Sequence, residues 1–108
     1  KHYGKDHPEC GVTLTHLANA WGNLGDYEKQ RDMLTKALRI QERHYGKNHP
    51  SYSPILGMLG NAWASLGDYE KQRDILTEAL QIEEKHYGKD HPLYSATLTN
   101  LGNAWGDL

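Results

Sequence analysis

A 42-residue segment occurs twice in this chain and begins a third time. Residues 43–84 repeat residues 1–42 with 26 identical positions, and residues 85–108 match residues 43–66 at 15 positions. A period of this length is typical of arrays in which each unit buries its apolar face against the next unit. We therefore expect a single array with units 1–42 and 43–84 and a partial unit, 85–108.

Each unit contains the pattern of two helices joined by a Gly-Asp pair. Leu56, Leu59 and Trp63 recur at the three- and four-residue spacing of one helix face. Gly67 ends this helix, and Asp68 is placed to cap a second one. Because the connection is so short, the two helices must be antiparallel. The pattern predicts an all-α chain with helices near 8–24, 26–45, 50–66, 68–87 and 92–107.

The residue pattern also separates an expected core from an expected surface. The leucine stripe of the first helices and all three tryptophans match the buried face, so we expect them in the core. The second helices carry charged residues that we expect to be solvated. These residues are Lys29, Arg31 and Asp32 and their copies Lys71, Arg73 and Asp74.

The octet KHYGKDHP connects the units and recurs at 1–8, 43–50 and 85–92, with one arginine and one asparagine in the middle copy. A glycine just past a helix can close its last turn, and a proline can open the next helix because its missing N–H costs nothing there. We therefore interpret the octet as an inter-unit turn. Gly46 and Gly88 would end helices, and Pro50 and Pro92 would begin them. The cap would be Asn48 or His49 in one copy and Asp90 or His91 in the next.

Two chemical alternatives for the octet are disfavoured. A zinc site needs about four ligands around one ion, whereas each octet offers two histidines and an acid that Asn48 replaces in the middle copy. Equivalent histidines of successive units should lie about 8–10 Å apart, too far to share a metal. A single glycine before a lysine, with no preceding strand, does not form a phosphate loop. We expect no metal and no cofactor.

Composition excludes several further classes of protein. The net charge of −2 gives no basic footprint for nucleic acid, and no apolar run approaches the length of a membrane helix. The single cysteine, Cys10, excludes an internal disulfide framework and favours a reducing, cytoplasmic location. The chain begins with lysine, which suggests an excised segment. No catalytic grouping stands apart from the repeat, so we do not expect an enzyme.

The segment LGNAWASLGDYEKQRDILTEALQI at 59–82 resembles the tetratricopeptide repeat, with its Leu-Gly, aromatic, Gly-x-Tyr and Ala-Leu landmarks. The 42-residue period and the YGKDHP turn are similar to the longer repeats of kinesin light chains. The chain departs from the family pattern at Gln30 and Gln72, where a small alanine is usual, and at Leu34 and Leu76, where an aromatic residue is usual. The resemblance implies a right-handed α-solenoid whose first helices line a concave groove for peptides.

Residues opposite the leucine stripe are the candidates for that groove, and they vary between units more than the second helices do. They are His16, Asn19 and Asn23 in the first unit, Met58, Asn61 and Ser65 in the second, and Asn100, Asn103 and Asp107 in the third. Asparagine donates and accepts hydrogen bonds, so three in register could hold the main chain of an extended peptide. The alternative is that they are ordinary exposed polar residues. The basic residues with which family members clamp a carboxylate are missing.

A second functional hypothesis is self-association. We expect Leu98, Leu101, Trp105 and Leu108 to lack the second helix that would cover them in a complete third unit. Apolar side chains left in contact with water drive association. The partner would be another copy of the chain, bound by end-to-end stacking or by an exchange of terminal helices.

Overall fold

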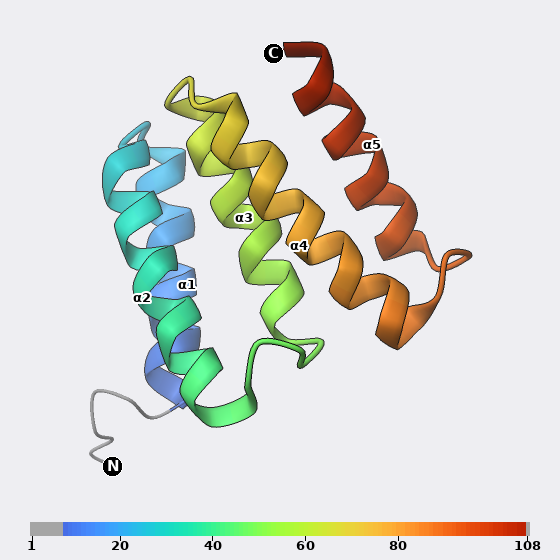
Figure 1. The fold of residues 1–108 in the computed structure, drawn as a ribbon. Coiled ribbons are helices and arrows are strands. Elements are labelled where there is room, and N and C mark those ends of the chain that lie inside the picture. Colours follow the sequence, from blue (N-terminus) through green and yellow to red (C-terminus); the bar gives the residue numbers. More distant parts are fainter. Residues whose placement is uncertain (1–7, 108) are drawn as a thin grey trace.

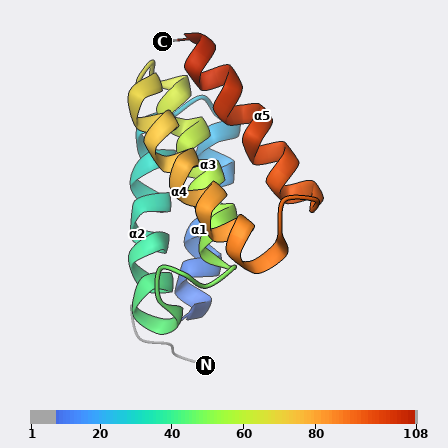
Figure 2. The same ribbon diagram turned by 45° about the vertical axis from the view of Figure 1, so that its right-hand side comes forward.

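The computed structural model describes residues 8–107 and contains five helices, with no strand in that range. Their order along the chain is α1 (Pro8–Asn23), α2 (Tyr27–Tyr45), α3 (Tyr52–Ser65), α4 (Tyr69–Tyr87) and α5 (Pro92–Asp107). Each helix packs on the next one along the chain, from α1 to α5. In Figures 1 and 2, α2 and α4 lie in front of α1 and α3, and α5 lies at one end beyond α4. The all-α prediction is confirmed, and the first octet, 1–8, lies almost wholly outside the described residues.

The turn from the first to the second helix of a unit is formed as its Gly-Asp pair predicts. Gly25 and Gly67 have positive φ angles of 81° and 86°. A carboxylate oxygen of Asp26 accepts a hydrogen bond from the Lys29 amide at 3.2 Å, and Asp68 does the same for Lys71 at 3.1 Å. Each aspartate thus satisfies one of the free amides at the start of the second helix.

The predicted start of the third helix is wrong by two residues. Pro50 and Ser51 lie in a turn, and α3 begins at Tyr52. The chain is tightly wound there, because the amide of Tyr52 bonds the carbonyl of His49 and the amide of Ser53 bonds that of Pro50. The Ser51 hydroxyl also donates to Oε1 of Gln41, on α2, at 2.9 Å, which anchors the turn. In the next unit Leu93 replaces Ser51, and α5 begins at Pro92 as predicted.

The core lies where the first helices meet the second helices. Leu34 and Leu76, which replace the usual aromatic residue, are 0% and 1% exposed, so leucine fills this position in both units. Gly60 lets α4 approach α3 closely, because a Cβ there would lie 3.3 Å from the Leu76 side chain. The core cluster of buried residues consists of Ala18, Leu34, Ala37, Leu38, Tyr52, Ile55, Leu56, Leu59, Ala62, Ala79 and Ile82.

The tryptophans and the basic residues of the second helices differ from the prediction. Trp21 and Trp63 are only half-buried, and Trp105 is 58% exposed. Arg31 and Arg73 are not freely solvated, because their side chains are 27% and 28% exposed.

Each guanidinium lies over a tryptophan of the following unit. The Arg31 guanidinium is 5.0 Å from the Trp63 ring, and that of Arg73 is 4.9 Å from the Trp105 ring. The ammonium of Lys29 lies 4.1 Å from the Trp21 ring, and that of Lys71 lies 4.4 Å from the Trp63 ring. Cation–π contacts therefore join neighbouring units at positions predicted to face solvent. Asp32 and Asp74 are exposed as predicted.

Candidate functional site

The first helix of each unit turns one side away from its neighbours, and most of the predicted groove residues lie there. Asn19, Asn61 and Asn103 occupy equivalent places on α1, α3 and α5, and all three are exposed. The exposed residues among the other candidates are His16, Asn23, Ser65, Asn100 and Asp107. We call these eight residues together with Met58 the asparagine face.

Met58 differs from the other members of the asparagine face. Its side chain is half-buried and packs against the core cluster. It can offer only part of its surface to a ligand, since the remainder supports the core. In this unit the neighbouring positions Asn61 and Ser65 carry the exposed polar atoms.

The electrostatic character of the asparagine face is close to neutral. The sequences of α1, α3 and α5 contain no lysine or arginine. Asp107 is the only acidic member of the face, and His16 is the only imidazole. The face therefore offers amide and hydroxyl groups for neutral hydrogen bonds rather than a charged clamp for a carboxylate.

The histidines of the octet turn have structural partners. Nδ1 of His49 accepts the Ser51 amide at 3.1 Å, and Nδ1 of His91 accepts the Leu93 amide at 3.1 Å. His91 therefore caps α5, which begins at the next residue. In the middle copy the bond to His49 lies within the turn, and α3 is preceded by Ser51, which makes no side-chain cap bond, so the prediction of Asn48 or His49 as its cap is wrong. The His91 ring also stacks on Tyr87 with 4.5 Å between ring centroids. Among residues 8–107 no three histidine, cysteine, aspartate or glutamate side chains are grouped closely enough to hold a metal.

The end of each second helix follows the prediction in part. Gly46 and Gly88 have the expected positive φ angles, 82° and 85°. Their ψ angles of 165° and 167° show that the chain leaves the helix in an extended direction instead of a left-handed turn. Nε2 of His86 also contacts the carbonyl oxygen of Asn48, which ties the end of α4 to the preceding inter-unit turn.

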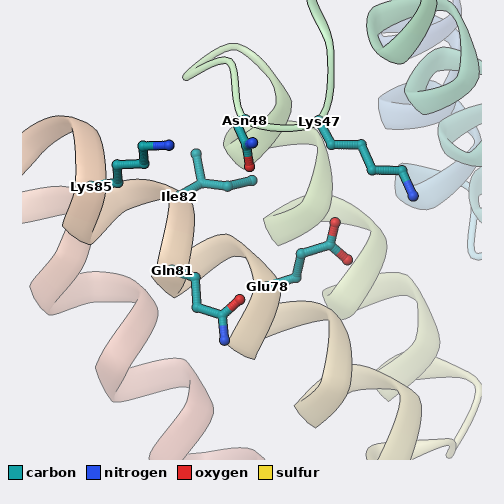
Figure 3. Close-up of a pocket in the computed structure, with 6 residues that line it drawn as sticks. All are labelled: Lys47, Asn48, Glu78, Gln81, Ile82 and Lys85. Atoms are coloured by element: carbon teal, nitrogen blue, oxygen red, sulfur yellow. The ribbon is translucent and has the colours of Figure 1, made fainter.

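A pocket that the sequence analysis did not identify lies between this inter-unit turn and α4. Its volume is about 240 Å³, and Lys47, Asn48, Glu78, Gln81, Ile82 and Lys85 line it (Figure 3). Lys85 extends toward Asn48, whereas Gln81 points away from the turn. Lys47 is also 3.7 Å from a carboxylate oxygen of Glu42. These amide, ammonium and carboxylate groups can recognise a polar ligand by hydrogen bonds.

The signal that could have revealed this pocket is a difference between two nearly identical helices. Lys36 and Arg39 on α2 become Glu78 and Gln81 at the equivalent positions of α4. Substitutions between repeated helices are most easily tolerated at positions whose side chains do not pack between units. A comparison of the two second helices would therefore have indicated this surface.

One ionisable group near the pocket is strongly perturbed. Tyr52 is 6% exposed. Burial, followed by the nearby carboxylates of Glu78 and Glu42, raises the pKa of Tyr52 from 10.0 to about 12. Both causes disfavour the phenolate, since burial removes solvent from the anion and the carboxylates repel it.

Two further depressions lie beside the Gly-Asp turns. One has a volume of about 350 Å³ and involves Leu24–Glu28 of the first unit and Leu66 of the second. The other has a volume of about 470 Å³ and involves Leu66–Glu70 of the second unit and Asp107 of the third. They are equivalent features of successive units.

None of the described helices is long and apolar enough to cross a membrane.

Comparisons with known proteins agree with the fold. The protein BtubC (BKLC) from P. vanneervenii gives a TM-score of 0.88 at 22% identity, covering 95% of this chain and 41% of that one. The TPR-like repeats of a putative kinesin light chain from Podosopora anserina give a TM-score of 0.81 at 22% identity, covering 97% and 50%. A variant of the latter gives 0.83 with the same identity and coverage. The chain thus spans half of these relatives or less.

No protein with curated annotation matches the sequence. A family model described as tetratricopeptide repeat matches residues 11–51 and 55–93. Each match covers one helix pair and the inter-unit turn that follows it. The helix pairs, their antiparallel arrangement and their stacking are those of a tetratricopeptide solenoid. The chain belongs to the tetratricopeptide repeat family.

Proposed function

We propose that this chain is a non-catalytic scaffold that binds an extended peptide segment of a partner protein along the asparagine face. Tetratricopeptide repeats are generally protein–protein interaction modules. The observation that carries the proposal is the alignment of Asn19, Asn61 and Asn103 on equivalent exposed positions of α1, α3 and α5. One exposed amide per unit matches the need of an extended main chain for regularly spaced donors and acceptors.

The chemistry of the asparagine face defines the partner further. Without lysine or arginine on α1, α3 and α5, the face lacks the groups that would favour an acidic peptide or a terminal carboxylate. The proposed ligand is therefore an uncharged, polar stretch of protein, recognised mainly through its backbone. We also propose that the chain is cytoplasmic and that it binds no nucleic acid, membrane or cofactor.

Replacing Asn61 with alanine is expected to weaken binding of such a peptide about fivefold, equivalent to about 1 kcal/mol, because one neutral hydrogen bond is lost. Stability should be almost unchanged, since Asn61 is exposed. The probe is a peptide selected from a randomised display library against the wild-type chain. Its affinity for both proteins can be measured by titration calorimetry.

Gln81→Ala is the matched control, because it removes an exposed amide from the second helix α4. It should leave the affinity of the selected peptide unchanged. Equal affinity of the wild type and the Asn61→Ala variant would remove Asn61 from the binding surface. A melting temperature lowered by many degrees would assign Asn61 a structural role instead.

Self-association is a second candidate function, and the exposure of α5 favours it. Leu98 is 48% exposed, whereas the equivalent Leu56 on α3 is 2% exposed. Trp105 is 58% exposed, whereas the equivalent Trp63 packs against the core. Leu101 is half-buried, and Leu108 lies outside the described residues.

Sedimentation equilibrium tests this candidate. We expect the mass-average molecular weight of the wild type to rise with concentration in the high micromolar range, and that of Trp105→Lys to stay at the monomer value. A charged side chain at this position would have to be desolvated on association, which disfavours the complex. A wild type that remains monomeric throughout would contradict self-association.

A further inference from the structure

The pocket between the inter-unit turn and α4 lies within the array, with further helices on both sides of it. Helix α2 precedes the turn, and α5 follows α4 and packs on it. Two tertiary contacts hold the turn. The Ser51 hydroxyl bonds Gln41 of α2, and the carbonyl oxygen of Asn48 contacts Nε2 of His86 on α4. The fold therefore positions both walls of this pocket without a ligand.

The charged side chains of the pocket are separated into a basic end and an acidic end. Lys85 lies at one end and extends toward Asn48 (Figure 3). Glu78 lies seven residues earlier on α4, about 10 Å away along the helix axis, and its carboxylate points to the side of Lys47. The buried side chain of Ile82 lines the pocket between them. A ligand that fills the pocket thus meets a cation, an apolar side chain and an anion in turn.

Glu78 is the group that the fold leaves without a counter-ion. Its side chain is half-buried. Burial, and then the carboxylates of Glu78 and Glu42, raise the pKa of Tyr52, so both carboxylates lie near the same buried ring. The ammonium of Lys47 lies 3.7 Å from a carboxylate oxygen of Glu42. Within residues 8–107 the Glu78 carboxylate has no ion pair of its own, and a cationic ligand would compensate its charge.

The size of the pocket limits the ligand to a single side chain. Its volume of about 240 Å³ is below the roughly 300–1,000 Å³ of usual small-molecule sites. Arginine fits the order of groups, because its aliphatic stem can cover Ile82 while its guanidinium forms two parallel hydrogen bonds with Glu78. A guanidinium is also more weakly hydrated than an ammonium, so its partial burial favours arginine over lysine.

The basic end of the pocket matches the main chain that carries such an arginine. A peptide places a carbonyl oxygen next to each side chain, and the Lys85 ammonium can donate to it. We propose that the pocket binds an arginine side chain of a partner protein, with its guanidinium on Glu78 and the neighbouring main-chain carbonyl on Lys85. This contact surface consists of a turn and a second helix. It is separate from the asparagine face, which lies on the first helices.

The first unit does not repeat this chemistry. Lys36 and Arg39 of α2 occupy the positions of Glu78 and Gln81. Cations at these positions would repel a guanidinium. Of the two described second helices, only α4 therefore has the carboxylate that the proposed arginine site requires.

Two peptides that differ by one charge test the proposal on the unaltered chain. The probe is Gly-Ser-Arg-Ser-Gly, blocked at both ends, and its control contains citrulline, which has nearly the same shape and no charge. In a titration of the ¹⁵N-labelled chain, the arginine peptide should change the amide shifts of Asn48, Glu78 and Lys85 and saturate at millimolar concentration. The citrulline peptide should bind at least tenfold more weakly, because the charge-assisted pair is lost. Equal binding of the two peptides, or equally tight binding of the lysine analogue, would overturn the proposal.

Two substitutions on α4 locate the charge that the arginine peptide recognises. Glu78→Gln should raise the dissociation constant of this peptide at least tenfold. Glu84→Gln is the matched control, because Glu84 is exposed on the same helix and pairs with Lys89 at 3.6 Å, outside the pocket. It should leave the dissociation constant unchanged. Equal losses in the two variants would indicate general attraction to an acidic helix and overturn the site.

The position of the shift changes separates this proposal from peptide binding by the asparagine face. Changes confined to α1, α3 and α5 would overturn the arginine site and leave the asparagine face as the binding surface. Changes around the pocket that disappear with citrulline would support the arginine site, whatever the peptide from the display library does. The comparison of peptides uses the wild-type chain, so it tests the proposal even if Glu78→Gln does not fold.

Discussion

Replacing Leu76 with alanine is expected to lower the free energy of unfolding by about 3 kcal/mol, within the roughly 2–5 kcal/mol typical of such core substitutions. Leu76 is 1% exposed, and its side chain reaches the surface of α3 at Gly60. Alanine would remove apolar contacts and leave a cavity between α3 and α4. Because each helix packs mainly on its neighbours along the chain, the loss would fall on the central joint of the array. Urea unfolding followed by circular dichroism measures it.

Leu93→Ala provides the control for this prediction. Leu93 is 43% exposed on α5, so the same chemical change there should cost less than about 1 kcal/mol. Equal losses for the two variants would mean that Leu76 is not part of a close-packed interior. A large loss for Leu76→Ala alone would support the stacking of α4 on α3.

We expect the free energy of unfolding of the wild type to fall between pH 10 and pH 12. In the Tyr52→Phe variant most of this fall should be absent. Burial and the carboxylates of Glu78 and Glu42 raise the pKa of Tyr52 to about 12 in the folded chain, whereas an unfolded tyrosine ionises near pH 10. The folded state therefore favours the neutral phenol. Its contribution is complete below pH 10 and is lost as pH rises toward 12, because the unfolded chain releases the proton first.

A pKa difference of about two units corresponds to about 3 kcal/mol, which sets the upper limit of the effect. The measurement is the difference in unfolding free energy between wild type and Tyr52→Phe at pH 9, 10, 11 and 12. Other tyrosines and lysines titrate in both proteins and cancel in this difference. Tyr87→Phe is the control, since Tyr87 is 39% exposed and its pH dependence should parallel that of the wild type. Parallel curves for Tyr52→Phe would contradict the assignment.

The elements that the sequence predicted well are those fixed by short-range chemistry. The Gly-Asp turns depend on the conformational freedom of Gly25 and Gly67 and on the capping carboxylates of Asp26 and Asp68. These interactions span three residues or fewer, so the local pattern contains all the partners. The start of α5 at Pro92 was predictable for the same reason.

The features that could not be predicted depend on partners from different units. α3 begins later than predicted because Ser51 bonds Gln41, ten positions earlier. Gln41 is buried, and a polar side chain near a helix end gives no indication of that. Arg31 and Arg73 stack on tryptophans of the following unit, and their charge alone indicated solvent. Both contacts depend on the register between units. The periodicity within one unit gives no information on that register.

The candidate site was predictable in position and less so in detail. Placing Asn61 opposite the leucine stripe required only the helical period, and the residue is exposed. Met58 is shared between the surface and the core, because α3 is covered on two sides by α2 and α4. The pocket lined by Lys47 and Glu78 lies between the turn at the start of the second unit and the second helix of that unit, which are far apart in the sequence, so no single motif indicated it.

Amide chemical-shift mapping can show whether the asparagine face holds an extended peptide. A ¹⁵N-labelled chain would be titrated with a peptide selected from the display library. We predict that the largest shift changes fall on α1, α3 and α5, around Asn19, Asn61 and Asn103. Changes confined to α2 and α4, or to the pocket beside Lys85, would contradict peptide binding by the asparagine face and place the binding surface on the second helices.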